Sequence, residues 1–258
     1  MAASRESLGR VLGVALALCL VCSVVVSVAA VALKPAQQAN KTRDLKRNIL
    51  MAAGLYEPTV SVEEQFEQVE SRVVDLDLGV FVDDIDAHQF DQRAAAKDPE
   101  QSKVLASEDD PARIVRRENR ALVYLVRDQR GALGKLILPV HGYGLWSTLY
   151  GFMALESDLN TVAGLGFYEH GETPGLGGEV DNPRWKALWH GKQVYRGESL
   201  EIRVLKGSVD AGSQEADWQV DGLSGATLTT RGVNNLVRYW LGEEGFKPLL
   251  DNLREGEA

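Results

Sequence analysis

The sequence predicts an α+β fold, a single domain of mixed strands and helices behind one N-terminal transmembrane helix. Three observations support this prediction. Residues 11–33 carry no charge. Strand-like and helix-like segments then follow one another without the regular alternation that a parallel sheet requires. The 258 residues, 45% of them hydrophobic and 25% charged, suffice for one sizeable core.

The uncharged stretch is long enough to cross a bilayer. As a helix, residues 11–33 would rise roughly 35 Å, more than the thickness of the hydrocarbon core. A cleaved signal peptide ending at Ala30-Val31-Ala32 is the alternative, but signal peptides have apolar regions of only about 7–15 residues. We therefore expect an uncleaved anchor, preceded by a cytoplasmic segment (residues 1–10) and followed by a linker and helix (residues 34–60).

Two short helices are expected next. Pro35 opens a polar linker over residues 34–40, and residues 45–55 have a helical pattern. A second helix begins at Ser61, which forms a capping box with Glu64. The apolar stripe expected to continue this helix comprises Phe66, Val69 and Val73. A folded domain is expected over residues 61–258.

The rest of the chain mixes strands with few helices. Residues 121–126 and 133–140, on either side of Asp128-Gln129-Arg130-Gly131, predict a β-hairpin. Further strands or extended segments are expected at residues 76–82, 149–155, 161–168, 202–209 and 218–220. Helices are expected at residues 184–189 and from Thr229 or Thr230 to Leu241, with a polar loop and short helix at 83–113.

Composition excludes several functions. The net charge of −9 argues against a nucleic-acid partner, because phosphate binding requires a basic face. The two cysteines, Cys19 and Cys22, lie in the apolar span, where we interpret them as small apolar residues. Glu169, His170 and Glu172 are of metal-ligating types, but no partner ligand is spaced as in a zinc motif, so we expect no metal.

The segment Asp221–Thr230 is a candidate phosphate site. Its small residues allow a tight turn, and the helix that follows directs free N–H groups and its positive dipole end toward that turn. A threonine hydroxyl there could bind a phosphate or be joined to it covalently. An ordinary turn with a threonine helix cap is the alternative.

Two further segments are candidate binding loops. Gly142-Tyr143-Gly144 lacks the third glycine of a dinucleotide loop, since Ser147 stands there, and no βαβ unit surrounds it. Leu145 and Trp146 offer flat apolar surface for a ring, or belong to the core. The glycine-rich loop 172–177 could direct N–H groups at a flavin ring, or form an ordinary surface turn.

These segments resemble a known family. Ser224-Gly225-Ala226-Thr227 is similar to the Ser/Thr-Gly-Ala-Thr motif of the FMN-binding domain in the C and B subunits of the sodium-translocating NADH:quinone reductase, and in the G subunit of the Rnf complex. Residues 143–151, 167–179 and 182–185 resemble the pattern of the C subunits. With the N-terminal span, the resemblance covers nearly the whole chain, least clearly at residues 83–113.

The resemblance implies a covalent flavoprotein. In the family the last threonine of the motif, here Thr227, carries FMN through a phosphoester. The FMN would accept single electrons from an iron–sulfur centre and pass them to the flavin of the B subunit. The complex as a whole oxidises NADH, reduces ubiquinone and exports sodium. The other residues expected to contact the cofactor are Ser224, Gly225, Ala226, Leu145, Trp146, Glu172, Thr173, Leu176 and Gly177.

The resemblance also implies partners and a location. The partners would be the A, B, D, E and F subunits and a transferase that attaches the flavin. The flavin domain would face the periplasm from the bacterial inner membrane. Five basic residues after the span oppose this orientation, but long hydrophilic domains translocate largely regardless of nearby charge. The alternatives are the G subunit of an Rnf-type complex, a cofactor-free anchored scaffold, and a free-standing flavin reductase.

Overall fold

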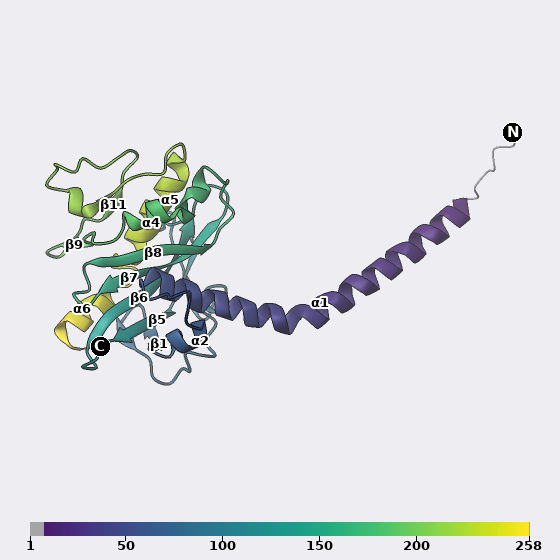
Figure 1. Cartoon of the computed structure of the whole chain (residues 1–258), viewed down its shortest axis with the longest axis horizontal. Helices are drawn as coiled ribbons and strands as arrows, with labels where there is room; N and C mark the ends of the chain where they lie inside the picture. Colours follow the sequence, from purple (N-terminus) through teal and green to yellow (C-terminus); the bar gives the residue numbers. More distant parts are fainter. Residues whose placement is uncertain (1–7, 258) are drawn as a thin grey trace. The chain divides into compact units, whose positions relative to one another are not determined.

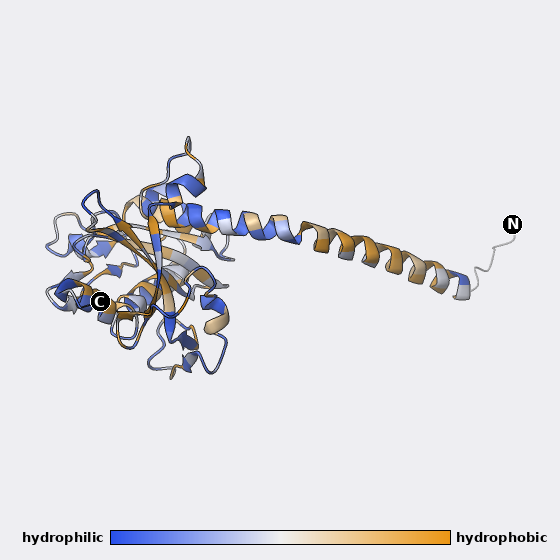
Figure 2. Ribbon diagram, turned by 90° about the horizontal axis from the view of Figure 1, so that it is seen from below, coloured by the Kyte–Doolittle hydropathy of each residue, from blue (hydrophilic) through white to orange (hydrophobic). Residues whose placement is uncertain are grey.

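The structure is a computed structural model that describes residues 8–257. Its contacts divide the chain into two compact units, one up to Leu45 and one from Lys46 onward. The first unit is part of one long helix, α1 (Leu8–Ala52), whose hydrophobic residues concentrate toward its N-terminus (Figure 2). By length and composition this helix is apolar enough to cross a membrane, as predicted from residues 11–33. Of the predicted segment 1–10, residues 1–7 lie outside the described residues.

The predicted linker at residues 34–40 is wrong, because α1 continues through it. Pro35 lies inside the helix and removes one backbone hydrogen bond. The alanines and glutamines that follow it are good helix formers, and they extend the helix into the segment expected at 45–55. The end of α1 belongs to the second unit, where Ile49 and Leu50 are buried, so this compact unit begins before the predicted residue 61.

The second helix begins as predicted but ends earlier. The Ser61 hydroxyl caps α2 (Val62–Phe66) by accepting a hydrogen bond from the N–H of Glu64 at 3.2 Å. Val69 and Val73 lie instead in strand β1 (Val69–Asp75). Residues four apart share a face in a helix and in a strand alike, so their spacing does not separate the two.

The centre of the second unit is a six-stranded antiparallel sheet in the order β2-β1-β5-β6-β7-β8 (Figure 1). The predicted hairpin is confirmed, with Tyr124 opposite Ile137. The strand predicted at 76–82 is wrong in extent, because only β2 is extended there. The strands besides β1 are β2 (Val80–Phe81), β5 (Arg120–Arg127), β6 (Leu133–Tyr143), β7 (Thr148–Glu156) and β8 (Val162–Glu169).

Short elements and two longer helices complete the unit. The segment predicted as extended at 202–209 forms only β11 (Arg203–Val204), which pairs in parallel with β12 (Gln219–Val220). The final helix, α6 (Lys247–Glu255), was not predicted. The helices are α3 (Gln92–Ala95), η1 (Gly177–Asp181), α4 (Pro183–Ala187), η2 (Ala216–Trp218), α5 (Thr227–Trp240) and α6 (Lys247–Glu255). The remaining strands are β3 (Ser102–Val104), β4 (Arg116–Glu118), β9 (Tyr195–Arg196), β10 (Ser199–Leu200), β11 (Arg203–Val204) and β12 (Gln219–Val220).

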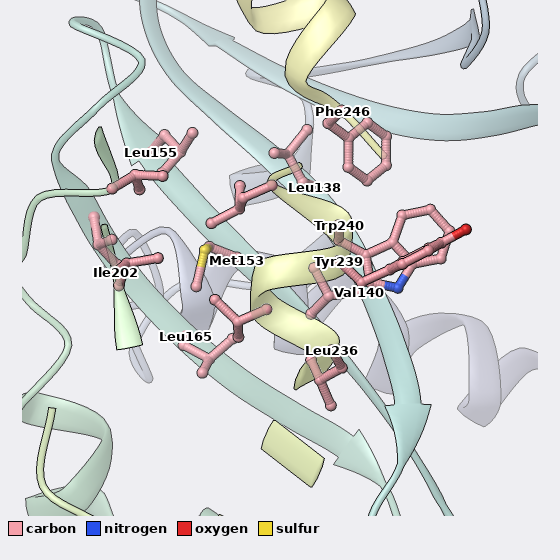
Figure 3. Close-up of a cluster of buried hydrophobic side chains, with 14 of the residues drawn as sticks. Leu138, Val140, Met153, Leu155, Leu165, Ile202, Leu236, Tyr239, Trp240 and Phe246 are labelled. Carbon is pink, nitrogen blue, oxygen red and sulfur yellow. The ribbon is translucent and has the colours of Figure 1, made fainter. Parts of the chain in front are cut away.

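Helix α5 packs against one face of the sheet. Leu138 of β6, Met153 of β7 and Leu165 of β8 meet Leu236 and Trp240 of α5 in the main core (Figure 3). Successive strand residues point to opposite faces. On the other face of β8, Gly164 lies against the end of α1, where an added Cβ would come within 2.4 Å of the Ala52 carbonyl oxygen. This packing fixes the N-terminus of α5 beside the ends of β6 and β8.

Candidate functional site

The first turn of α5 contains the predicted phosphate site. Gly225 has a φ of +74°, a left-handed conformation that favours glycine, and it turns the chain into the helix. Ala226 occupies the N-cap position and contributes no side-chain hydrogen bond. Thr227, the first helical residue, is exposed. The turn is closed from within, because the buried Thr230 hydroxyl accepts a hydrogen bond from the N–H of Leu223 at 3.0 Å.

The predicted glycine-rich loop 172–177 lies against this turn. An added Cβ on Gly225 would meet the side chain of Leu176 at 3.3 Å. Part of the loop's hydrogen-bonding capacity is used internally, since the N–H groups of Leu176 and Gly178 both donate to the carbonyl of Thr173, at 3.1 and 2.9 Å. These two N–H groups are therefore not available to a flavin ring, although other N–H groups of the loop could still be directed at one.

Glu172 connects three segments of the site. The side chain is buried, with 5% exposure. Its Oε1 accepts hydrogen bonds from the N–H groups of Leu145 and Trp146, each at 3.0 Å, and from that of Ser147 at 3.4 Å. Its Oε2 accepts from the Thr229 hydroxyl at 2.6 Å. One carboxylate thus ties the turn after β6, the glycine-rich loop and the first turn of α5.

The electrostatics of Glu172 follow from these contacts. Burial alone would raise the pKa of this carboxyl group. The hydrogen bonds from the Thr229 hydroxyl and from the N–H groups of Trp146, Leu145 and Ser147 stabilise the charged form, and the net result is a pKa below the ordinary value. The carboxylate is therefore ionised at neutral pH.

Two glycines allow the chain to approach this carboxylate. A Cβ on Gly144 would lie 2.6 Å from Oε1 of Glu172. A Cβ on Gly177 would lie 2.5 Å from the Thr229 hydroxyl and 2.6 Å from Oε2 of Glu172. Both glycines thus serve close packing of the site, and any larger residue would displace one of its parts.

Exposed apolar side chains lie on the three segments that Glu172 connects. Trp146 is 64% exposed, Leu228 51%, Leu176 46% and Leu145 36%. Leu228 was missed by the sequence analysis, although its place directly after Thr227 was a detectable signal. The structure brings Leu145 and Trp146 to the same carboxylate as the start of α5, but on exposed surface rather than in the core.

One basic residue near the site was also missed. Arg113 lies 4.4 Å from the centre of the Tyr143 ring, and the Tyr143 hydroxyl donates to the Trp146 carbonyl at 3.4 Å. Arg113 has a φ of +55° in a loop without a clear sequence pattern, so no local signal pointed to it.

The site is open surface. Two cavities of about 270 and 450 Å³ lie elsewhere, the first beside Asp75 and Gln101 and the second beside Arg72 and Leu253. Within residues 8–257, no group of three or more His, Cys, Asp or Glu side chains is arranged to hold a metal ion. Glu169 instead pairs with Arg93 at 2.9 Å.

Comparison with known proteins places these features in a family. Residues 144–242, which contain both loops and the start of α5, match the model of the FMN-binding domain. The chain is 57% identical to the C subunit of the Na(+)-translocating NADH-quinone reductase of Pseudomonas aeruginosa, over 99% of this chain and all of that protein. The chain belongs to the family of these C subunits. The corresponding protein of Vibrio vulnificus is 48% identical over 98% of both chains.

A solved structure agrees with this family assignment. The crystal structure of Shewanella oneidensis NqrC matches with a TM-score of 0.76 and 39% identity, covering 84% of this chain and 99% of that one. The match confirms the α+β fold class and the resemblance to the C subunits. It favours a C subunit over the G subunit of an Rnf-type complex.

Proposed function

We propose that the chain is the electron-carrying subunit of a membrane-bound Na(+)-translocating NADH-quinone reductase and carries FMN as a phosphoester on Thr227. The reductase assignment rests on relatives with this name, whose sequences match this chain over nearly its full length. The observation that carries the flavin site is the exposed Thr227 at the uncapped N-terminus of α5, beside exposed apolar side chains.

The start of α5 fits a phosphate. The first N–H groups of a helix have no intrahelical acceptor, and Ala226 offers no capping oxygen. These donors and the positive end of the 14-residue helix dipole favour an anion at this position. A phosphoryl group on the Thr227 hydroxyl would be within reach of them, so the residues present fit the esterified cofactor.

The surroundings fit a flavin ring. Four exposed apolar side chains offer area on which a flat ring can pack: Leu145, Trp146, Leu176 and Leu228. Binding sites for small molecules usually enclose most of the ligand. A ring on this open surface would keep one face exposed, and a covalent bond would hold it where contact area alone does not.

The chain's own residues bind and orient the cofactor. Bound FMN supplies the transfer of single electrons. Glu172 holds the turn that bears Trp146 at a fixed place relative to Thr229, two residues after the attachment site. The predicted Ser224, Gly225 and Ala226 form the tight turn before Thr227, and Thr173 and Gly177 form the opposing loop.

The remaining parts of the circuit belong to other chains. No motif of this sequence resembles an NADH, quinone or sodium site, so we assign these to the A, B, D, E and F subunits. Attachment of the flavin requires a transferase. The apolar composition of α1 supports a single-pass anchor. From this anchor the domain would face the periplasm, as in the family that the sequence resembles.

In-gel flavin fluorescence after denaturing electrophoresis tests the ester. The native chain and Thr227→Ala are each expressed with a flavin-attaching transferase. The matched control is Thr59→Ala, which alters an exposed threonine distant from Thr227 in the sequence. We expect fluorescent bands for the native chain and the control and a dark band for Thr227→Ala.

A dark native band, with attachment verified on a second substrate protein, would contradict the ester and favour a cofactor-free scaffold. Turnover of an electron donor by the isolated chain would instead favour a free-standing flavin reductase.

A further inference from the structure

His170 links the loop of the candidate site to a neighbouring turn. Its Nε2 lies 2.8 Å from Oδ2 of Asp181, and its Nδ1 lies 3.2 Å from the backbone nitrogen of Glu172. The Glu172 N–H can donate only to a ring nitrogen without a proton. The hydrogen-bond network therefore assigns the neutral tautomer in which Nε2 carries the proton and donates it to Asp181.

The backbone next to His170 is tied to the surface that bears Trp146. The N–H of Gly171 donates to the Ser147 hydroxyl oxygen at 2.6 Å. The carboxylate of Glu172 holds the N–H groups of Trp146 and Ser147. Residues 170, 171 and 172 thus each make a directed contact, and a displacement of the Glu172 backbone moves the turn that carries Trp146.

We propose that His170 is a positioning residue, which couples its own protonation to the geometry of the flavin-binding surface. A second proton can enter only at Nδ1. There it would face the Glu172 N–H, two donors 3.2 Å apart, so the N–H would lose its acceptor and the ring or the backbone would move. Because the surface in question is that of the flavin, this inference rests on the function proposed above.

Charged groups face His170 from several elements. The carboxylate of Asp181 in η1 contacts the ring, and Lys186 of α4 lies 3.4 Å from that carboxylate. Next to His170 in the sequence, Glu169 forms an ion pair with Arg93. The Glu172 carboxylate accepts hydrogen bonds from backbone N–H groups. The His170 side chain keeps 13% exposure, so a proton can reach it from water. Histidine is the side chain whose charge ordinarily changes between about pH 5 and 8.

The first arm of the test uses the full-length chain without flavin. In the Thr227→Ala background, the backbone amide resonance of Glu172 is followed by NMR from pH 5 to 8. We expect one titration step, absent in His170→Asn, whose Oδ1 stands near the place of Nδ1 and accepts the same N–H without titrating. Asp181→Asn should move the step to lower pH, because the imidazolium loses its neighbouring carboxylate. His88→Asn, which alters an exposed histidine, should leave the step unchanged.

The second arm measures the flavin midpoint potential over the same pH range in the flavin-loaded chain. We expect an added inflection at the pH of the amide step, which disappears in His170→Asn. A Glu172 amide that does not titrate, or whose step survives in His170→Asn, would overturn the proposal. A flavin midpoint potential with no inflection at the pH of the amide step would also overturn the proposal. A native chain that takes up no flavin would refute the proposed function, while the amide arm would still decide whether His170 moves Glu172.

Discussion

At the scale of single residues, Glu118 is a buried carboxyl group with incomplete pairing. It is fully buried, and its Oε1 accepts a hydrogen bond from the Gln92 amide at 2.5 Å. Its Oε2 has no partner among the described residues. Burial raises the pKa of Glu118 to about 7, although the Gln92 hydrogen bond and the charge of Arg117 act in the opposite direction.

Because of this raised pKa, we expect the stability of the folded chain to fall as the pH rises. In the unfolded chain the group loses its proton near its ordinary value of 4.5, whereas in the folded chain it keeps the proton up to about pH 7. Between these values the folded state binds more protons, so its stability decreases as pH rises, by about 1–3 kcal/mol. Glu118→Gln, which mimics the protonated form, should lack this decrease.

Urea unfolding of the full-length chain at pH 4.5, 6 and 8 measures the effect of Glu118. The exposed Glu100→Gln is the matched control and should follow the native chain. The prediction would be contradicted if the free energy of unfolding changed with pH equally in Glu118→Gln and in the native chain.

The residues of the candidate site were predictable only in part. The tight turn of small residues before Thr227 follows from local patterns, and the structure contains it. The helix predicted to start at Thr229 or Thr230 begins earlier, so that Thr227 is its first residue. The partners of Glu172 do not follow from local patterns, since they lie 26 residues before it at Trp146 and 57 after it at Thr229. A contact across such separations depends on the pairing of β6, β7 and β8, which no local pattern contains.

At the scale of elements, α5 packs closely against the end of β6. An added Cβ on Gly232 would lie 2.6 Å from the Tyr143 carbonyl oxygen and 2.9 Å from the Cα of Gly144. Both neighbours are backbone atoms and cannot rotate away. The helix would have to move from the strand, and with it the turn that bears Leu145 and Trp146.

Gly232→Ala should therefore destabilise the fold. Alanine is the better helix former by about 1 kcal/mol, but overpacking against backbone costs about 1–3 kcal/mol and sets the sign. Thermal unfolding of the full-length chain measures it, with Gly207→Ala as the control, since a Cβ there meets nothing within 4 Å. A Gly232→Ala chain that melts above the native chain would show that the helix has room to shift without loss.

The elements that the sequence predicted poorly are short. Helix α6 has nine residues, too few to be stable alone, and it depends on contacts with the rest of the domain. The Asn252 side chain donates to the carbonyls of Leu78 and Gly79, and the backbone of Pro248 packs against Gly79. The longer hairpin strands β5 and β6, by contrast, carried enough pattern to be predicted within a few residues.

At the scale of the whole molecule, the charges after the apolar span bear on its orientation. Two of the five, Lys46 and Arg47, lie over the rings of Phe66 and Tyr56 at 5.0 and 4.9 Å, within the folded unit. They are charges of the domain rather than of the segment next to the membrane. The remaining three are Lys34, Lys41 and Arg43. The charge bias against export is therefore smaller than the sequence alone indicates, and a long domain is translocated largely regardless of it.

Labelling of a surface cysteine tests the periplasmic orientation. Gln214 is an exposed loop residue of the folded unit, and the two native cysteines lie in the apolar part of α1. Gln214→Cys, with both native cysteines replaced by alanine, should react with a membrane-impermeant maleimide in intact spheroplasts as fully as after lysis, because no bilayer would separate the reagent from the domain. The cysteine-free chain should remain unlabelled. Reaction only after lysis would place the flavin domain in the cytoplasm, and the basic residues after the span would then have set the orientation despite the size of the domain.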